Sequence, residues 1–200
     1  MAAGFGRIQR ALAQESQPDY TSKAPRYTFS NTLETQEAQL KTNPLLKRFQ
    51  AARKEKAKDP YRPIYHYYNP EGGLGDMNGL CFWQGRWHLF YQSWPLEDRR
   101  QHWGHAVSED LIHWRDLPHA IYPGPEKYCF SGNTLVEADR VIAMYHGPKA
   151  GTMVAVSSDP LLLNWKKVTG QAVIPFPKPG EPPTPYKIWD PCIFKIDGTY

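Results

Sequence analysis

The sequence predicts an all-β fold built from propeller-like repeat units, preceded by a short helical extension. After residue 60, short apolar segments alternate with turn residues, and a Ser-x-Asp pattern followed by Trp occurs twice. Asp110 and Trp114 carry the first copy, and Asp159 and Trp165 carry the second, so the copies lie about 50 residues apart. Such a period is typical of arrays in which each unit holds several strands. An aromatic content of 14% and 19 prolines also favour a strand-rich chain over a helix bundle.

The extension is the first element in chain order. Residues 33–58 show an interrupted apolar stripe of helical period, and Pro44 is expected to divide them into two short helices. Asp59-Pro60 then stops the helix. We therefore predict two regions, a polar and partly helical extension over residues 1–60 and an incomplete propeller domain over residues 61–200.

Three hairpins come after the extension. Their predicted strand pairs are residues 80–83 with 87–91, 133–136 with 141–145, and 192–195 with 199–200. These segments amount to two complete units and the beginning of a third, whereas a closed propeller requires at least about four blades. We expect the chain to be the N-terminal part of a longer protein or a truncated gene product.

Charge and composition exclude several classes of function. Residues 1–60 hold 11 Lys and Arg against 6 Asp and Glu, but residues 61–200 hold 13 against 14. The aromatic-rich region therefore lacks the clustered cations that nucleic-acid binding requires. Apolar runs are far shorter than the ~20 residues of a membrane helix. Without a secretory apolar segment at the N-terminus, we predict a cytoplasmic protein.

Cysteines and histidines give no metal site in this interpretation. Cys81, Cys129 and Cys192 lie far apart in apolar segments and are expected to be buried free thiols. His102, His105 and His113 are close in sequence but lack a partner carboxylate motif. We expect ordinary packing or surface histidines there and no metal.

Two carboxylates precede equivalent strands of different units. Asp76 lies in a Gly-rich segment before the first hairpin, and Asp190 lies in Trp189-Asp190-Pro191 before the third. Because the innermost strands of propeller blades converge, these acids could meet across a funnel. Glycoside hydrolysis needs such a carboxyl pair. The alternative is that each aspartate is a turn residue. Aromatic side chains near this funnel are expected to stack on sugar rings, namely Trp83, Trp94, Trp103, Phe130 and Trp189.

Four segments resemble family 32 of the glycoside hydrolases, the β-fructosidases that include invertase, inulinase and levanase. The matching segments appear in family order over about residues 64–200. They are 75–80 with 87–92 (the Asn-Asp-Pro-Asn-Gly motif and its following strand), 103–114, 130–132 (Phe-Ser-Gly) and 189–191 (Arg-Asp-Pro).

The resemblance implies a five-bladed β-propeller that hydrolyses β-fructofuranosides of an oligo- or polysaccharide with retention, and without metal or organic cofactor. Asp76 would be the nucleophile, and Asp190 would hold sugar hydroxyls and stabilise the transition state. The implied substrate-binding residues are Asn78, Gln92, Phe130, Ser131 and Trp189.

The sequence departs from the family pattern at four points. Gly75 replaces Asn, Met77 replaces Pro, Trp189 replaces Arg, and no Glu-Cys pair supplies the general acid within residues 1–200. We therefore expect the 200 residues alone to be inactive. Two alternatives remain open: an inverting arabinosidase- or xylosidase-like propeller hydrolase, and a non-catalytic carbohydrate-binding propeller.

Overall fold

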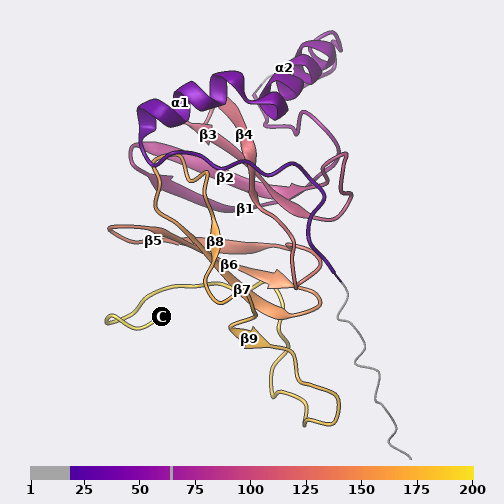
Figure 1. Cartoon of the computed structure of the whole chain (residues 1–200), viewed down its shortest axis with the longest axis vertical. Helices are drawn as coiled ribbons and strands as arrows, with labels where there is room; N and C mark the ends of the chain where they lie inside the picture. The colour runs from indigo at the N-terminus through magenta and orange to yellow at the C-terminus, as the bar shows by residue number, and fades with distance from the viewer. Residues whose placement is uncertain (1–18, 64) are drawn as a thin grey trace, which may run out of the picture.

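The computed structural model describes residues 19–63 and 65–200. They form two antiparallel β-sheets that lie next to each other, with two helices and an extended segment against one end (Figure 1). The β-rich prediction with only a short helical region is confirmed. Neither helix in the described part of the chain is long and apolar enough to cross a lipid bilayer.

The first sheet has four strands in chain order. They are β1 (Leu74–Trp83), β2 (Arg86–Ser93), β3 (His102–Ser108) and β4 (Trp114–Ile121). Gln84 and Gly85 connect β1 to β2 with positive φ angles of 45° and 81°, the conformation that a tight two-residue hairpin turn requires. The predicted hairpin over residues 80–91 is thereby confirmed.

The second sheet repeats this arrangement with shorter outer strands. Its strands are β5 (Gly132–Val136), β6 (Val141–Gly147), β7 (Gly151–Ser157), β8 (Lys166–Lys167) and β9 (Ile174–Pro175). Strands β5 to β8 are neighbours in order, and β9 pairs with the other end of β7. The hairpin predicted over 133–145 is confirmed. The third hairpin is wrong as predicted, because residues 196 and 199 form only an isolated bridge.

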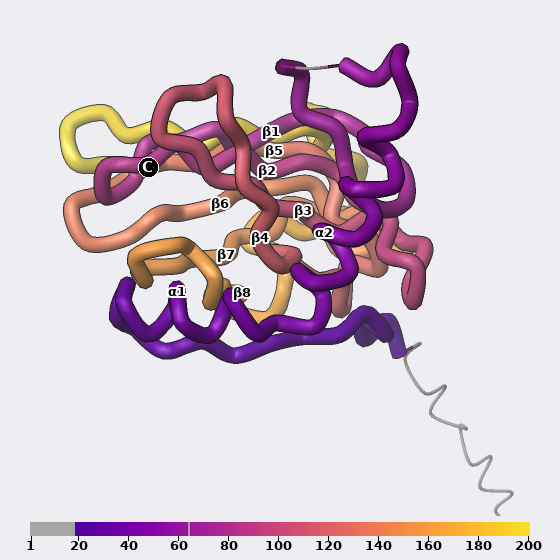
Figure 2. The backbone as a smooth tube through the Cα atoms, turned by 90° about the horizontal axis from the view of Figure 1, so that it is seen from above, coloured from indigo at the N-terminus to yellow at the C-terminus, as the bar shows by residue number. Residues whose placement is uncertain are grey.

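The innermost strands β1 and β5 run next to each other, as both views show (Figures 1 and 2). Buried aromatic side chains fill the space between the sheets, with Phe90 and Trp103 from the first sheet and Tyr145 from the second. Their ring centroids lie 5.6 Å (Phe90 to Trp103) and 5.7 Å (Trp103 to Tyr145) apart. Each sheet therefore buries one face against the other.

Helices α1 (Leu33–Thr42) and α2 (Pro44–Lys56) divide where the sequence predicts, at Pro44. The Asn43 side chain accepts hydrogen bonds from the amides of Leu45 and Leu46 and so caps α2. Proline at the first helical position has no N–H that would need an acceptor there. The buried face of the helices contacts Leu117 of β4 and Leu161 of the turn between β7 and β8. The helices thus cover the outer edges of both sheets.

Gln36 of α1 is a fully buried polar link between the extension and the second sheet. Its Nε2 donates to Asp159 Oδ1 (2.6 Å) and to the Ser30 carbonyl oxygen (2.9 Å), and its Oε1 accepts from the Leu161 amide (3.1 Å). Because a buried amide must find partners, this contact fixes how α1 sits on the sheet. The boundary predicted at residue 60 stays a prediction, but the extension packs tightly on both sheets.

The repeated Ser-x-Asp pattern forms the same turn in both sheets. Ser108 Oγ donates to Asp110 Oδ1 (3.1 Å), and Ser157 Oγ donates to Asp159 Oδ2 (3.0 Å). Both aspartates also accept backbone amides three to five residues further on. These aspartates are structural, as the repeat indicates, but Asp159 is buried and Asp110 is exposed.

The tryptophan of each repeat closes its turn. Trp114 Nε1 donates to the Leu111 carbonyl oxygen (3.1 Å), and Trp165 Nε1 donates to that of Leu162 (2.8 Å). Both leucines have a positive φ, 66° and 50°, which costs conformational energy for a residue with a Cβ atom. The tertiary contacts of the turn therefore hold a backbone shape that leucine alone disfavours.

Four histidines are buried within the first sheet, on strands β2, β3 and β4. They are His88, His102, His105 and His119. Burial lowers the pKa of His88 to about 3, that of His102 to about 4 and that of His119 to about 3, and it lowers the pKa of His105 well below its usual value. These histidines are therefore neutral in the folded protein at neutral pH.

Cys81 and Cys129 are buried free thiols as predicted, but Cys192 is exposed, because the segment around it forms no strand.

Of the three histidines considered as a metal set, His113 is exposed and pairs with Asp110, whereas the other two are buried. Within residues 19–63 and 65–200 no group of three potential metal ligands is found.

Replacing Asp159 by alanine is expected to lower the free energy of unfolding by about 2–4 kcal/mol, because several buried donors then lose their acceptor. The repeat-equivalent change, Asp110→Ala, is the matched control and should cost markedly less, since its donors reach water. Urea unfolding of both variants measures the difference. Equal losses would show that the buried link to Gln36 contributes nothing.

Acid is expected to destabilise the fold well above the pKa of its carboxylates. Below the ordinary histidine pKa of 6.5 the histidines of the unfolded chain become protonated, whereas the buried histidines of the folded protein stay neutral. The free energy of unfolding therefore decreases as the pH is lowered. Each such histidine should cost about 2 kcal/mol at about pH 5. Unfolding measured between neutral and acid pH tests this. His119→Gln should flatten the slope, whereas His113→Gln at the surface should not.

Candidate functional site

Asp76 lies in an irregularity of strand β1. Residues Leu74 and Ser93 pair across the β1–β2 ladder, and so do Met77 and Tyr91, which leaves two residues of β1 opposite only Gln92. Such a bulge redirects a side chain out of the regular alternation. The Asp76 carboxylate is consequently exposed rather than directed into the sheet packing.

A chain of hydrogen bonds orients this carboxylate. Gln92 Nε2 donates to Ser131 Oγ (2.8 Å), and Ser131 Oγ donates to Asp76 Oδ2 (2.9 Å). Gln92 Nε2 also lies 3.4 Å from Asp76 Oδ2, a longer and weaker contact. Within the described residues only Oδ2 of Asp76 is engaged in this way. Asp76 Oδ1 accepts no hydrogen bond from any described residue.

Ser131 reaches Asp76 because its backbone is fixed to both sheets. The Phe130 amide donates to the His146 carbonyl oxygen (2.9 Å), and the His146 amide donates to that of Ser131 (3.0 Å). Trp103 Nε1 of the first sheet donates to the Phe130 carbonyl oxygen (2.9 Å). The contact between Ser131 and Asp76 is therefore a contact between sheets, held on each side by backbone hydrogen bonds.

Asn78 and Gly79 shape the strand beyond Asp76. Asn78 Nδ2 donates to the Asp76 carbonyl oxygen (3.2 Å), and its Oδ1 is buried with no partner among the described residues. Gly79 has a φ of 58°, and its carbonyl oxygen accepts from Thr134 Oγ1 of β5 (2.9 Å). The Asp-x-Asn-Gly order thus gives a bent strand that is joined to the second sheet.

Trp94 is a neighbour of this site whose contacts the sequence reasoning missed. A Cβ atom on Gly75 would lie 2.8 Å from Trp94 Cη2 and 2.7 Å from Gln92 Oε1, and one on Gly73 would lie 3.0 Å from Trp94 Cε3. The indole therefore lies directly against the glycine-rich start of β1. The hairpin register, which places residue 94 opposite residue 73, is the signal that would have predicted the contact.

The expected aromatic lining is only partly correct. Trp83 and Trp103 are buried in the core and are not available to a sugar, so this prediction is wrong for them. Phe130 is half-buried and Trp189 is 63% exposed. The Phe130 and Trp189 rings lie edge to face, with centroids 6.3 Å apart. These two side chains form an aromatic surface next to Ser131.

Asp190 is exposed and lies close to the same aromatic surface. Trp189 packs on His146 with ring centroids 4.6 Å apart. Burial lowers the pKa of His146, and the negative charge of Asp190 opposes this shift. Asn133 of β5 holds the following residues, because its Oδ1 accepts from the Ile193 amide (2.8 Å). The second sheet therefore positions the segment that carries Asp190.

The arrangement brings Asp76, Gln92 and Ser131 into direct contact and places Phe130 on the same loop as Ser131. An exposed carboxylate with one oxygen held by a hydroxyl and the other open is suited to act as a nucleophile or a base. Neutral amide and hydroxyl groups around it match sugar hydroxyls in polarity. Carbohydrate chemistry is thus compatible with the geometry.

Comparison with known proteins identifies close relatives of this region. The sequence model described as "Glycosyl hydrolases family 32 N-terminal domain" matches residues 66–200. A levanase of Bacillus subtilis is 36% identical over 135 residues, which are 60% of this chain and 20% of the levanase. A sucrose-6-phosphate hydrolase of Escherichia coli is 37% identical over 98 residues, 46% of this chain and 20% of the relative.

Solved structures show the same similarity in three dimensions. A Bombyx mori β-fructofuranosidase gives a TM-score of 0.58 at 31% identity and covers 83% of this chain and 35% of its own. Fructan 1-exohydrolase IIa of Cichorium intybus gives a TM-score of 0.54 at 34% identity and covers 61% of this chain and 25% of its own. The chain spans about a fifth or less of the length of the first curated relatives it matches.

Gly75→Ala is expected to lower the free energy of unfolding by about 1–3 kcal/mol, because the new methyl group meets Gln92 and Trp94. Trp94→Phe, with a smaller ring, should relieve part of this collision. The double variant is therefore expected to lose less than the sum of the single losses in a double-mutant cycle. Additive losses would contradict the contact between Trp94 and the start of β1.

Proposed function

Because the chain belongs to family 32 of the glycosyl hydrolases, we propose that it provides the nucleophile-bearing part of a site that hydrolyses β-fructofuranosides. The observation that carries this proposal is the Asp76 carboxylate, exposed in its bulge and held by Ser131 at 2.9 Å. Solved neighbours contain saccharides of the expected class, 1-kestose in a fructan 1-exohydrolase variant and sucrose in a β-fructofuranosidase variant.

The proposed reaction proceeds with retention in two displacements. The Asp76 carboxylate attacks the anomeric carbon of a fructosyl unit and forms a carboxylic ester, while the glycosidic bond breaks and its oxygen takes a proton from a general acid. Water then attacks the same carbon, gives its proton to the conjugate base of that acid, and releases fructose and free Asp76. The hydrogen bond from Ser131 keeps one oxygen of Asp76 fixed and the other directed at substrate.

The remaining predicted residues have supporting roles in this proposal. Asp190 binds hydroxyl groups of the fructosyl ring and stabilises positive charge that develops on it. Phe130 and Trp189 supply the apolar surface against which the ring lies. Gln92 and Asn78 provide amide groups for hydroxyls, and the unpartnered Asn78 Oδ1 is an acceptor available for this purpose.

The proton donor is the part of the machinery that these residues do not provide. We propose that a further segment of a longer chain supplies it and closes the two observed units into a five-bladed propeller. Loss of a general acid alone reduces rates about 10²–10⁴-fold. The isolated 200 residues are therefore expected to be inactive even with the Asp76 site formed.

In a longer form that contains the complete domain, Asp76→Asn is expected to reduce kcat for sucrose, inulin or levan by about 10⁴-fold, because the amide is a poor nucleophile. Asp110→Asn is the matched control and should keep its activity, since Asp110 acts in a turn. Reducing-sugar release under saturating substrate measures both. Wild-type activity in Asp76→Asn would remove the assignment of Asp76.

Proton NMR of the first sugar released separates retention from inversion. A retained anomer supports the covalent role of Asp76, and an inverted anomer would contradict it in favour of an arabinosidase- or xylosidase-like mechanism. Saturable sugar binding without turnover would identify a carbohydrate-binding propeller instead.

A further inference from the structure

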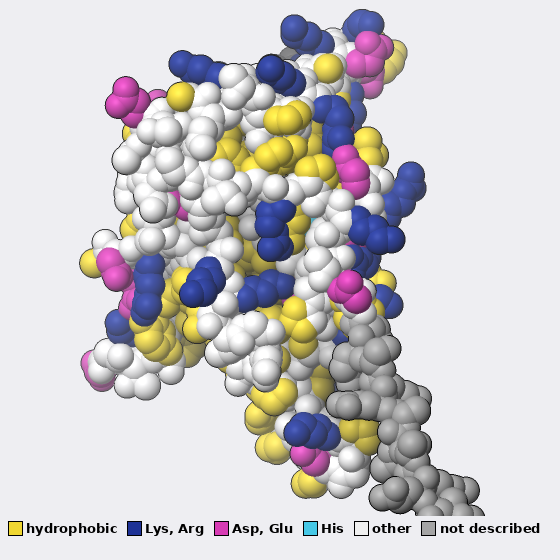
Figure 3. Space-filling model, in the orientation of Figure 1, with side chains coloured by type: hydrophobic (Ala, Val, Ile, Leu, Met, Phe, Trp, Pro, Cys, Tyr) yellow, Lys and Arg dark blue, Asp and Glu magenta, His cyan; other side chains and the backbone are white. Residues whose placement is uncertain are grey.

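A cavity of about 500 Å³ lies between the outer strands of the two sheets, and no residue of β1 lines it. It opens where β4 and β8 meet the extended segment before α1, and neither Asp76 nor its partners Gln92 and Ser131 line it. On the face shown in Figure 3, Lys and Arg side chains surround a hollow with hydrophobic side chains at its base. This volume is in the range of sites for small molecules.

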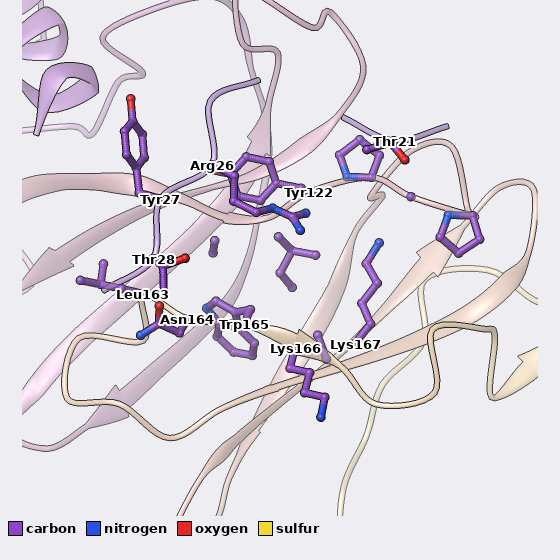
Figure 4. A pocket seen from close by; sticks show the side chains of 16 residues that line it. Thr21, Arg26, Tyr27, Thr28, Tyr122, Leu163, Asn164, Trp165, Lys166 and Lys167 are labelled. Atoms are coloured by element: carbon purple, nitrogen blue, oxygen red, sulfur yellow. The ribbon is translucent and has the colours of Figure 1, made fainter. Parts of the chain in front are cut away.

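The ionisable lining of this cavity is cationic. Arg26, Lys166 and Lys167 line it, and no Asp or Glu does. Arg26 and Lys166 form no ion pair with any residue of the described part of the chain. Figure 4 shows the Arg26 guanidinium and the Lys167 ammonium directed into the same open space, whereas the Lys166 side chain extends away from them. Arg26 and Lys166 therefore give the cavity a net positive charge, while the charge of Lys167 is balanced by Glu126.

Lys167 is anchored behind the cavity by Glu126. The Glu126 carboxylate is completely buried and pairs with Lys167, while the same oxygen accepts from Tyr145 Oη (2.8 Å). A Cβ atom on Gly124, which lines the cavity, would come 3.1 Å from Lys167 Nζ. Because Gly124 has no side chain, the Lys167 ammonium, which Glu126 holds in place, has room to face the cavity.

The walls of the cavity are fixed before any ligand arrives. Tyr122 Oη donates to the Pro25 carbonyl oxygen (3.0 Å), and the Arg26 guanidinium lies over the Tyr122 ring at 4.6 Å. The Trp165 indole is held by its hydrogen bond to Leu162. The floor contains Ile121 of β4. An aromatic and aliphatic surface next to two converging cations suits a ring-shaped body that carries an anionic group.

We propose that this cavity binds a phosphate-bearing small molecule, with the phosphate between Arg26 and Lys167 and the body of the ligand against Trp165. A phosphate offers several acceptor oxygens, which the planar guanidinium can engage in pairs and the ammonium from the opposite side. The site is independent of the Asp76 chemistry and would persist in a protein without hydrolase activity.

Isothermal titration calorimetry on the whole chain tests this with glucose 6-phosphate, inorganic phosphate and glucose as probes. Glucose 6-phosphate is expected to bind saturably, and glucose is not. Arg26→Gln should weaken binding about tenfold, the loss expected for one charge-assisted hydrogen bond. Lys166→Gln should weaken it less. Lys47→Gln, a change of an exposed lysine on α2, is the matched control and should leave it unchanged.

Circular dichroism of each variant verifies that it folds before its affinity is compared with that of the wild type. Equal affinity for inorganic phosphate would support the site with phosphate itself as the ligand. Four results would overturn the proposal: no saturable binding of either phosphate, equal binding of glucose, binding that is insensitive to Arg26→Gln, or binding that Lys47→Gln reduces equally.

Discussion

The packing of β5 against β1 is the contact on which both the core and the Asp76 site depend. A four-stranded sheet has two faces, and a single sheet of this size leaves one of them in water unless a second layer covers it. Here Phe90 and Trp103 of the first sheet meet Tyr145 of the second. The same juxtaposition puts Ser131 within hydrogen-bond distance of Asp76. Hydrophobic burial between the sheets thus fixes the polar contact at the site.

The extension strengthens this contact from the outside. It is joined to the first sheet through Arg53, which pairs with Asp116 of β4, and to the second sheet through Gln36 and Asp159. A segment attached to both sheets opposes their separation, because opening them would break buried polar contacts on one side or the other. The same bridging segment supplies Arg26 to the cavity at the outer edge. One short stretch of chain therefore serves both stability and the proposed second site.

The repeat made much of the fold predictable, because local signals determine it. Turn residues and alternating apolar segments specify the hairpins at 80–91 and 133–145, and Pro44 specifies the division of the helices. Contacts between distant segments were not predictable from one sequence. Nothing local in Gln36 indicates that it binds Asp159, and the exposure of Cys192 depends on a strand that does not form. At the site, the sequence motifs singled out Asp76, Gln92 and Ser131, which the structure brings together. The contact of Trp94 with the glycines at the start of β1 could be found only from the strand register in the structure.

The departures from the family pattern give the Asp76 site a particular character. Gly75 leaves room for Trp94 where a side chain would collide with it, and Trp189 supplies an exposed ring where an arginine fork would supply charge. Both changes exchange polar recognition for aromatic surface. If the site takes a furanoside as we propose, Ser131 and Gln92 direct the sugar and ring stacking supplies contact area, since sugar rings present apolar C–H faces as well as hydroxyls. On that proposal, the site would tolerate variation in the sugar beyond the fructosyl unit, because stacking constrains orientation less tightly than a bidentate charged contact does.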